Sequence, residues 1–122
     1  MSRHCEIVRR SLDLVETVGE GIDHIKANFE KGEFEASLPL LQGVAESLLC
    51  VLKAGFLVLG EKGFNDLSAC ARTLQAGLES LAGAYEARDW GAAASALKGQ
   101  VAVGYVCFKA GAEKLYGRAA GS

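Results

Sequence analysis

Apolar residues recur every three or four positions along most of the chain, and this spacing limits the possible folds more than any other feature. The first such series runs from Val8 to Phe29. Steps of three and four place side chains on one face of an α-helix. Further series predict helices over about residues 37–59, 66–85 and 90–115. Almost no strand signal remains, so the sequence predicts an all-α protein.

Short breaks join the predicted helices into two pairs. Gly32 follows the first helix at the place of a C-terminal cap, and residues 60–63 form a glycine-flanked break in the middle of the chain. A hairpin cannot bury its apolar stripe alone, so two hairpins should close into an antiparallel four-helix bundle. We expect one domain with similar hairpins at residues 5–60 and 64–116, and a short flexible C-terminal tail at residues 117–122.

Proline, capping and aromatic residues predict how these helices begin. Pro39 lacks a backbone donor, so the second helix either kinks or begins near Ser37 with the proline in its first turn. The side chain of Asn65 or Asp66 can cap the third helix. We expect Trp90, at the start of the fourth helix, and its equivalent Phe34 to anchor the hairpins, so that their loss costs stability.

The two hairpins resemble each other in sequence. When the first is aligned with the second without a gap, Lys53-Ala54-Gly55 corresponds to Lys109-Ala110-Gly111, and Glu33-Phe34 corresponds to Asp89-Trp90. Either a duplication or the shared period of unrelated helices explains these matches.

The second and fourth helices carry more apolar residues than one buried stripe requires. A helix that is apolar on all sides must be covered. We predict that the excess residues form an interface with a second copy of the chain or with an amphipathic helix of another protein. The interface candidates are Leu49, Phe56, Leu57 and Tyr105. The alternative is an irregular bundle in which the second helix is central and buried.

The cysteines and glycines suggest a different use of the core. Cys50, Cys70 and Cys107 should lie at similar heights in an antiparallel bundle, and three converging thiolates could bind a soft metal ion. Gly104 and Gly111 could leave space beside them for a ligand. The simpler interpretation is that the cysteines are small core residues and the glycines allow close packing. We therefore expect no metal and no cofactor, with a small-ligand or soft-metal site as the alternative.

No set of side chains matches a known type of active site. His4 and His24 lack a cysteine, serine or aspartate partner at a diagnostic spacing. Ser95 stands two residues before Leu97, where a histidine phosphotransfer domain would have its histidine. The sequence therefore predicts that the protein is not an enzyme.

Charge and hydropathy argue against several classes of partner. Thirteen lysines and arginines face fifteen acidic residues without a basic cluster, which argues against nucleic acid and anionic membranes. The most apolar stretch, residues 48–60, contains Lys53 and is shorter than the ~20 residues of a membrane span. Charged residues among the first positions argue against a signal peptide. We expect a cytoplasmic protein with no nucleic acid or membrane partner.

One turn and the apolar heptads after it carry a family resemblance. They comprise Glu30-Lys31-Gly32-Glu33-Phe34-Glu35-Ala36, followed by Leu38, Leu41, Ala45 and Leu48. From Ile22 to about Leu59 the chain resembles the hairpin turn of flagellin export chaperones, which are small cytoplasmic bacterial helical bundles. Over more of its length it is similar to uncharacterised bacterial domains made of two hairpins.

The resemblance implies a bundle that shields an amphipathic helix of another protein, and it transfers no functional residue. Together with the excess apolar residues, it favours a non-enzymatic bacterial helical bundle. We expect this bundle to work by protein association, either as a homodimer or as a chaperone-like adaptor.

Overall fold

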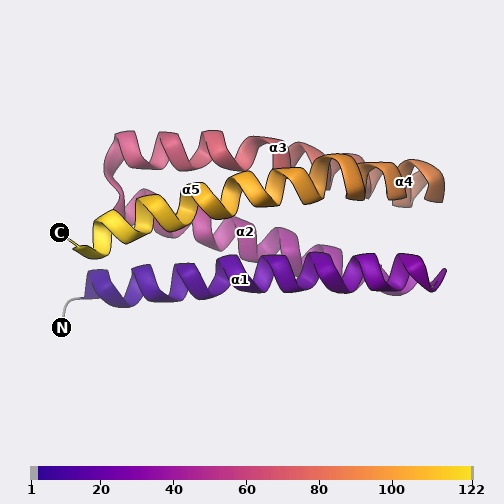
Figure 1. Cartoon of the computed structure of the whole chain (residues 1–122), viewed down its shortest axis with the longest axis horizontal. Coiled ribbons are helices and arrows are strands. Elements are labelled where there is room, and N and C mark those ends of the chain that lie inside the picture. The colour runs from indigo at the N-terminus through magenta and orange to yellow at the C-terminus, as the bar shows by residue number, and fades with distance from the viewer. Residues whose placement is uncertain (1–2, 122) are drawn as a thin grey trace.

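A computed structural model of the protein describes residues Arg3–Gly121 and confirms the all-α four-helix bundle. Its α-helices are α1 (Arg3–Glu30), α2 (Leu38–Val58), α3 (Gly60–Ala87), α4 (Trp90–Ala96) and α5 (Ala102–Gly121). A short 3-10 helix, Glu35–Ser37, precedes α2, and a π-helical segment, Leu97–Val101, joins α4 to α5. Because of this segment, α4 and α5 form one long helix (Figure 1). Residues 3–121 contain no strand.

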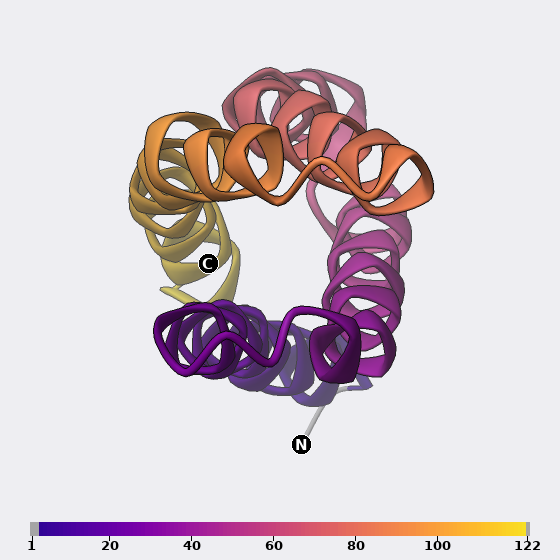
Figure 2. The same cartoon turned by 90° about the vertical axis from the view of Figure 1, so that its right-hand side faces the viewer.

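The helices run alternately up and down, and each packs against two neighbours. The helix α1 contacts α2 and α5, and α3 contacts the same two helices. In the end view, α2 and α5 therefore occupy opposite corners of a square (Figure 2). Both hairpin turns lie at one end of the bundle, and both chain ends lie at the other (Figure 1).

Left-handed residues close both hairpin turns. Gly32 follows α1 with φ of +76°, which suits glycine because it has no Cβ. Arg88 occupies the corresponding place after α3 with φ of +53°. The next residue, Asp89, caps α4, since its Oδ1 accepts a 3.0 Å hydrogen bond from the backbone N–H of Ala92.

The boundary between the hairpins differs from the prediction. The helix α3 begins at Gly60, so Asn65 and Asp66 lie inside it and cap nothing. Only Leu59 separates α2 from α3, because Gly60 has φ of +75° and reverses the chain within one residue. The predicted break at residues 60–63 and the hairpin start at residue 64 were therefore wrong.

Two other helix ends were also predicted. Pro39 lies in the first turn of α2, as expected. We expected a flexible tail at residues 117–122. The structure instead continues α5 through Gly121, so residues 117–121 are helical. Ser122 lies outside the described residues.

The buried stripe of the last helix departs from regular four-three spacing. Regular four-three spacing from Trp90 would place Ala94, Gly111 and Leu115 on this stripe, but all three are only half-buried. The fully buried positions are Ala93, Val101, Phe108, Ala112 and Tyr116. A π-helical turn holds more residues than an α-helical turn, so the segment Leu97–Val101 changes the phase of the stripe.

Candidate interaction surface

The outer face of α2 exposes large apolar side chains. The exposed fractions are 51% for Leu49, 69% for Phe56 and 72% for Leu57. The inner face is also apolar, because Leu48 and Leu52 are buried in the core. A helix that is apolar on both sides has more apolar surface than the bundle covers. The alternative in which this helix is central and buried was wrong.

The exposed surface continues as a groove onto α3. The groove has a volume of about 560 Å³. The ring of Phe56 on α2 packs edge-on against Phe64 on α3, with 5.4 Å between ring centroids. We call this region the α2–α3 surface, and its residues are Leu49, Leu52, Lys53, Phe56, Leu57, Phe64, Ser68 and Gln75.

Tyr105, the fourth interface candidate, is half-buried and is not part of this surface. Its hydroxyl donates a 3.0 Å hydrogen bond to the backbone carbonyl of Val15, so it joins α5 to α1. The ring fits where Gly19 has no side chain, since a Cβ there would lie 2.6 Å from Tyr105 Cζ. Burial is the main cause that raises the pKa of the Tyr105 phenol. On the same pair of helices, Lys109 Nζ lies 3.3 Å from Glu16 Oε1.

The exposed apolar residues of α5 form a separate patch. Val103 and Val106 are 59% and 69% exposed. Because α2 and α5 occupy opposite corners of the bundle, this patch cannot join the α2–α3 surface (Figure 2).

The three candidate metal-binding cysteines do not converge. Cys50 and Cys107 are exposed, and Cys70 is half-buried. Burial and the neighbouring Cys107 raise the pKa of the Cys70 thiol, so these two cysteines lie close together. Among residues 3–121, no group of three histidine, cysteine or acidic side chains could hold a metal ion. The structure therefore does not bring Cys50, Cys70 and Cys107 together as the soft-metal alternative requires.

The glycines next to these cysteines provide close packing rather than ligand space. A Cβ on Gly104 would lie 2.5 Å from the backbone nitrogen of Leu74. A Cβ on Gly111 would collide with the Sγ of Cys70. The helices α3 and α5 therefore fill the space that the ligand alternative required.

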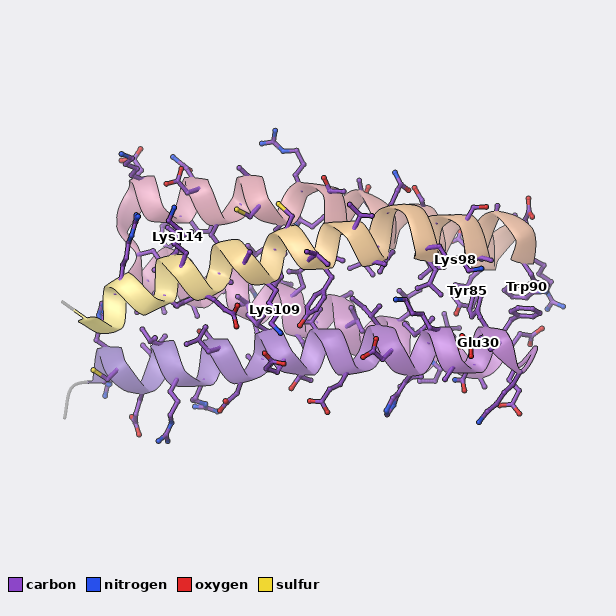
Figure 3. All side chains as sticks on the ribbon, in the orientation of Figure 1. Glu30, Tyr85, Trp90, Lys98, Lys109 and Lys114 are labelled. Atoms are coloured by element: carbon purple, nitrogen blue, oxygen red, sulfur yellow. The ribbon has the colours of Figure 1, made fainter. Side chains whose placement is uncertain are left out.

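A second hollow lies at the hairpin-turn end, between α1 and the start of α4. Its volume is about 600 Å³, and its lining residues are Lys26, Phe29, Glu30, Phe34, Trp90, Gly91, Ala94, Leu97 and Lys98. Figure 3 shows Glu30, Tyr85, Trp90 and Lys98 gathered at this end, whereas Lys109 and Lys114 lie further along the bundle. We call this hollow the turn-end pocket.

Aromatic rings line the turn-end pocket or support those that do. Phe34 and Trp90 stack with 5.1 Å between centroids and 9° between planes. Tyr85 packs edge-on against Trp90 at 5.4 Å. The sequence predicted Phe34 and Trp90 as anchors but missed the pocket. The available signal was that Lys26 and Lys98 each lie eight residues from one of these aromatic residues, Phe34 and Trp90 respectively.

The helical segment Glu35–Val58 is long and apolar enough to cross a membrane by length and composition alone. The sequence argument against a membrane span used the shorter stretch of residues 48–60. The helical segment is longer than that stretch, so its length does not distinguish a bundle helix from a membrane helix. The helices of the bundle bury 39% of its apolar window. Its outer face also carries the charged residues Glu46 and Lys53.

Comparisons with known proteins identify one family. Residues 6–105 match the model of a family described as a domain of unknown function (DUF8042). No curated protein and no solved structure matches the chain.

Proposed function

We propose that this chain, which belongs to the DUF8042 family, acts without catalysis by associating with protein through the α2–α3 surface. The single observation that supports the proposal is the exposure of Leu49, Phe56 and Leu57 above a groove shared with α3. Burying a phenylalanine or leucine side chain contributes about 1.5–3 kcal/mol. Phe56 and Leu57 are 69% and 72% exposed, so a partner that covers them would gain at most about 1–2 kcal/mol at each.

Single apolar side chains are common on the surfaces of soluble proteins and need no binding function to explain them. Leu49, Phe56 and Leu57 differ from that case, because Phe56 and Leu57 follow Leu49 by seven and eight residues on one helix, which places all three on one face. Phe64 extends the face onto α3. A contiguous apolar surface of this kind is typical of a site that binds protein.

The test replaces Phe56 with aspartate and uses Val106→Asp as the matched control. Both side chains are 69% exposed, but Val106 lies on the opposite corner of the bundle. We expect both variants to keep the circular dichroism of the native bundle. Light scattering on a size-exclusion column, at two concentrations and with reductant, should show that only Phe56→Asp loses association.

If the native protein is a monomer, the same variants can be tested with a labelled amphipathic helical peptide. Binding that Phe56→Asp abolishes and Val106→Asp preserves would support the proposal. A monomer that does not bind the peptide would contradict it. Phe56-dependent binding to phosphatidylcholine vesicles, without self-association or peptide binding, would instead identify α2 as a membrane-contacting helix and would also contradict it.

The turn-end pocket favours a second candidate function, the binding of a small amphipathic anion. The stacked rings of Phe34 and Trp90 give the pocket an apolar lining. Its charged lining residues are the lysines Lys26 and Lys98 and the single carboxylate Glu30, so the lining has a net positive charge. This lining suits a ligand with an aromatic or aliphatic body and one acidic group. The small-ligand candidate therefore lies at the hairpin-turn end of the bundle and not beside the cysteines.

Trp90 is the one tryptophan of the chain and lines this pocket, so its fluorescence reports occupancy. Anilinonaphthalene sulfonate bound there should quench Trp90. The double substitution Lys26→Ala and Lys98→Ala should weaken this quenching about tenfold, as expected for the loss of about 1.4 kcal/mol of charge interaction. Lys114→Ala, far from the pocket, should leave it unchanged. Equal quenching in all three proteins would contradict the second candidate.

A further inference from the structure

The outer face of α2 carries a continuous exposed stripe with a heptad pattern. Every residue of the stripe is exposed, and successive steps along it are one or three residues. Such a pattern forms the contact line of paired helices. We call it the α2 stripe, and its residues are Gln42, Gly43, Glu46, Leu49, Cys50, Lys53, Phe56 and Leu57.

Two charges of opposite sign interrupt this stripe. Glu46 and Lys53 are the charged residues of α2, and both are exposed. They are seven residues apart, which is about 10.5 Å along the helix, so they cannot pair with each other. Within residues 3–121, neither has an ion-pair partner in the protomer. Both charges are free to contact a partner that lies on the stripe.

We infer that a second copy of this chain covers the α2 stripe, with its α2 antiparallel and the two-fold axis between Leu49 and Cys50. The inference rests on the proposed function and specifies its partner. In this register Glu46 faces Lys53 of the second copy, and Lys53 faces Glu46. A parallel arrangement would instead place Glu46 against Glu46 and Lys53 against Lys53. Opposite charges are attractive and like charges are destabilising at a helix contact, so the stripe favours the antiparallel arrangement.

The sizes of the side chains agree with the same register. Phe56 of one copy faces Gly43 of the other. A Cβ built on Gly43 would have no neighbour within 4 Å, so the surface there is open. The 69% exposed ring of Phe56 can therefore lie over it without displacing a side chain. The largest exposed residue of the stripe faces its smallest one.

The stripe is self-complementary, and this property distinguishes a second copy from an unrelated helix. A two-fold interface requires that when one residue contacts another, the reverse contact also occurs. The pairs Glu46 with Lys53 and Gly43 with Phe56 both meet this condition about one axis. In a complex with a helix of another protein, nothing would require the two pairs of positions to be symmetric about the same point on α2.

Charge exchange tests the register. Glu46→Lys or Lys53→Glu alone places like charges together at two symmetric sites, and we expect dimer dissociation constants about tenfold higher. The double variant Glu46→Lys/Lys53→Glu restores opposite charges and should restore the native constant. Glu113→Lys on α5 is the control charge reversal and should change nothing. Circular dichroism verifies that each variant folds.

Cross-linking tests the position of the axis. In the proposed dimer the exposed Cys50 residues of the two copies lie on either side of the axis. A short bismaleimide should therefore link two chains in a variant whose other exposed cysteines, Cys5 and Cys107, are replaced by serine. The further change Cys50→Ser should remove the linked dimer.

The outcomes separate this inference from the proposed function. A dimer with charge rescue and a Cys50 cross-link supports both. A dimer that depends on Phe56 but lacks rescue or the cross-link overturns the antiparallel register and leaves association intact. A monomer that binds the amphipathic peptide through Phe56 overturns the second copy as partner and leaves the proposed function. A monomer that binds no peptide overturns both.

Discussion

The hydroxyl of Tyr116 on α5 donates a 2.6 Å hydrogen bond to the backbone carbonyl oxygen of Val51 on α2, across the diagonal of the bundle. Both residues are fully buried. Gly55 lies one turn after Val51, and a Cβ there would be 3.2 Å from the Tyr116 oxygen. A polar contact therefore fixes the distance between two helices that are not neighbours.

Tyr116→Phe should lower the free energy of unfolding by about 1 kcal/mol. The substitution keeps the ring in the core and removes one buried hydrogen bond, which is typically worth about 0.5–1.5 kcal/mol. Urea unfolding followed by circular dichroism measures the change. Tyr105→Phe removes a bond from a half-buried hydroxyl and should cost less. An equal or larger loss in Tyr105→Phe would contradict the importance of the diagonal bond.

Stability should fall as the pH rises above about 10. Burial is the main cause that raises the pKa of Tyr85, Tyr105 and Tyr116 above the ordinary value of 10.0. Above that value the unfolded chain releases phenol protons that the folded chain retains, so unfolding becomes easier; below it these tyrosines contribute no pH dependence. The slope is at most about 1.4 kcal/mol per pH unit for each tyrosine. Urea unfolding between about pH 9 and about pH 11 should show a smaller slope for Tyr116→Phe than for the native protein.

Gly104→Ala should destabilise the bundle, whereas Gly83→Ala should stabilise it. The new Cβ at position 104 would lie 2.5 Å and 2.7 Å from backbone atoms of Leu74, which cannot move without separating α3 from α5. Overpacking of this kind costs about 1–3 kcal/mol. Gly83 lies in the interior of α3 with nothing within 4 Å of a Cβ, so alanine there should gain about 0.5–1 kcal/mol. Thermal unfolding of both variants checks the opposite signs.

Asp89→Ala should destabilise the second hairpin by about 1 kcal/mol. Its carboxylate accepts the hydrogen bond from Ala92 that caps α4, and loss of such a cap costs about 0.5–2 kcal/mol. Asp66→Ala is the control, because Asp66 lies inside α3 and caps nothing. Chemical denaturation distinguishes the two variants. A greater loss for Asp66→Ala would contradict the position at which the structure begins α3.

The periodicity of apolar residues was sufficient to predict the helices and the bundle, because it reports directly on burial. It was insufficient at Gly60, where the helix α3 begins at the residue that looked like the start of a loop. A glycine that reverses the chain and a glycine that opens a loop have the same local sequence signal. Only the packing of α3 on α2 decides between them.

The candidate surface was predicted in part for a similar reason. Leu49, Phe56 and Leu57 exceed what one face of a helix can bury, and the structure exposes them. Tyr105 carried the same signal but fills the gap at Gly19 on α1. Predicting this contact requires the relative rotation of two helices, which the sequence of either helix does not contain. The role of the exposed residues stays a prediction until association is measured.

The π-helical segment Leu97–Val101 is equivalent to one residue inserted into an otherwise regular α-helix. Removal of Gly99, which is exposed and has no neighbour within 4 Å of a Cβ, would shorten this helix while retaining the inward directions of Ala93 before the segment and Phe108 after it. The helix α2 contains no such segment. The last helix of this fold can therefore change length by one residue without changing which side chains form the core.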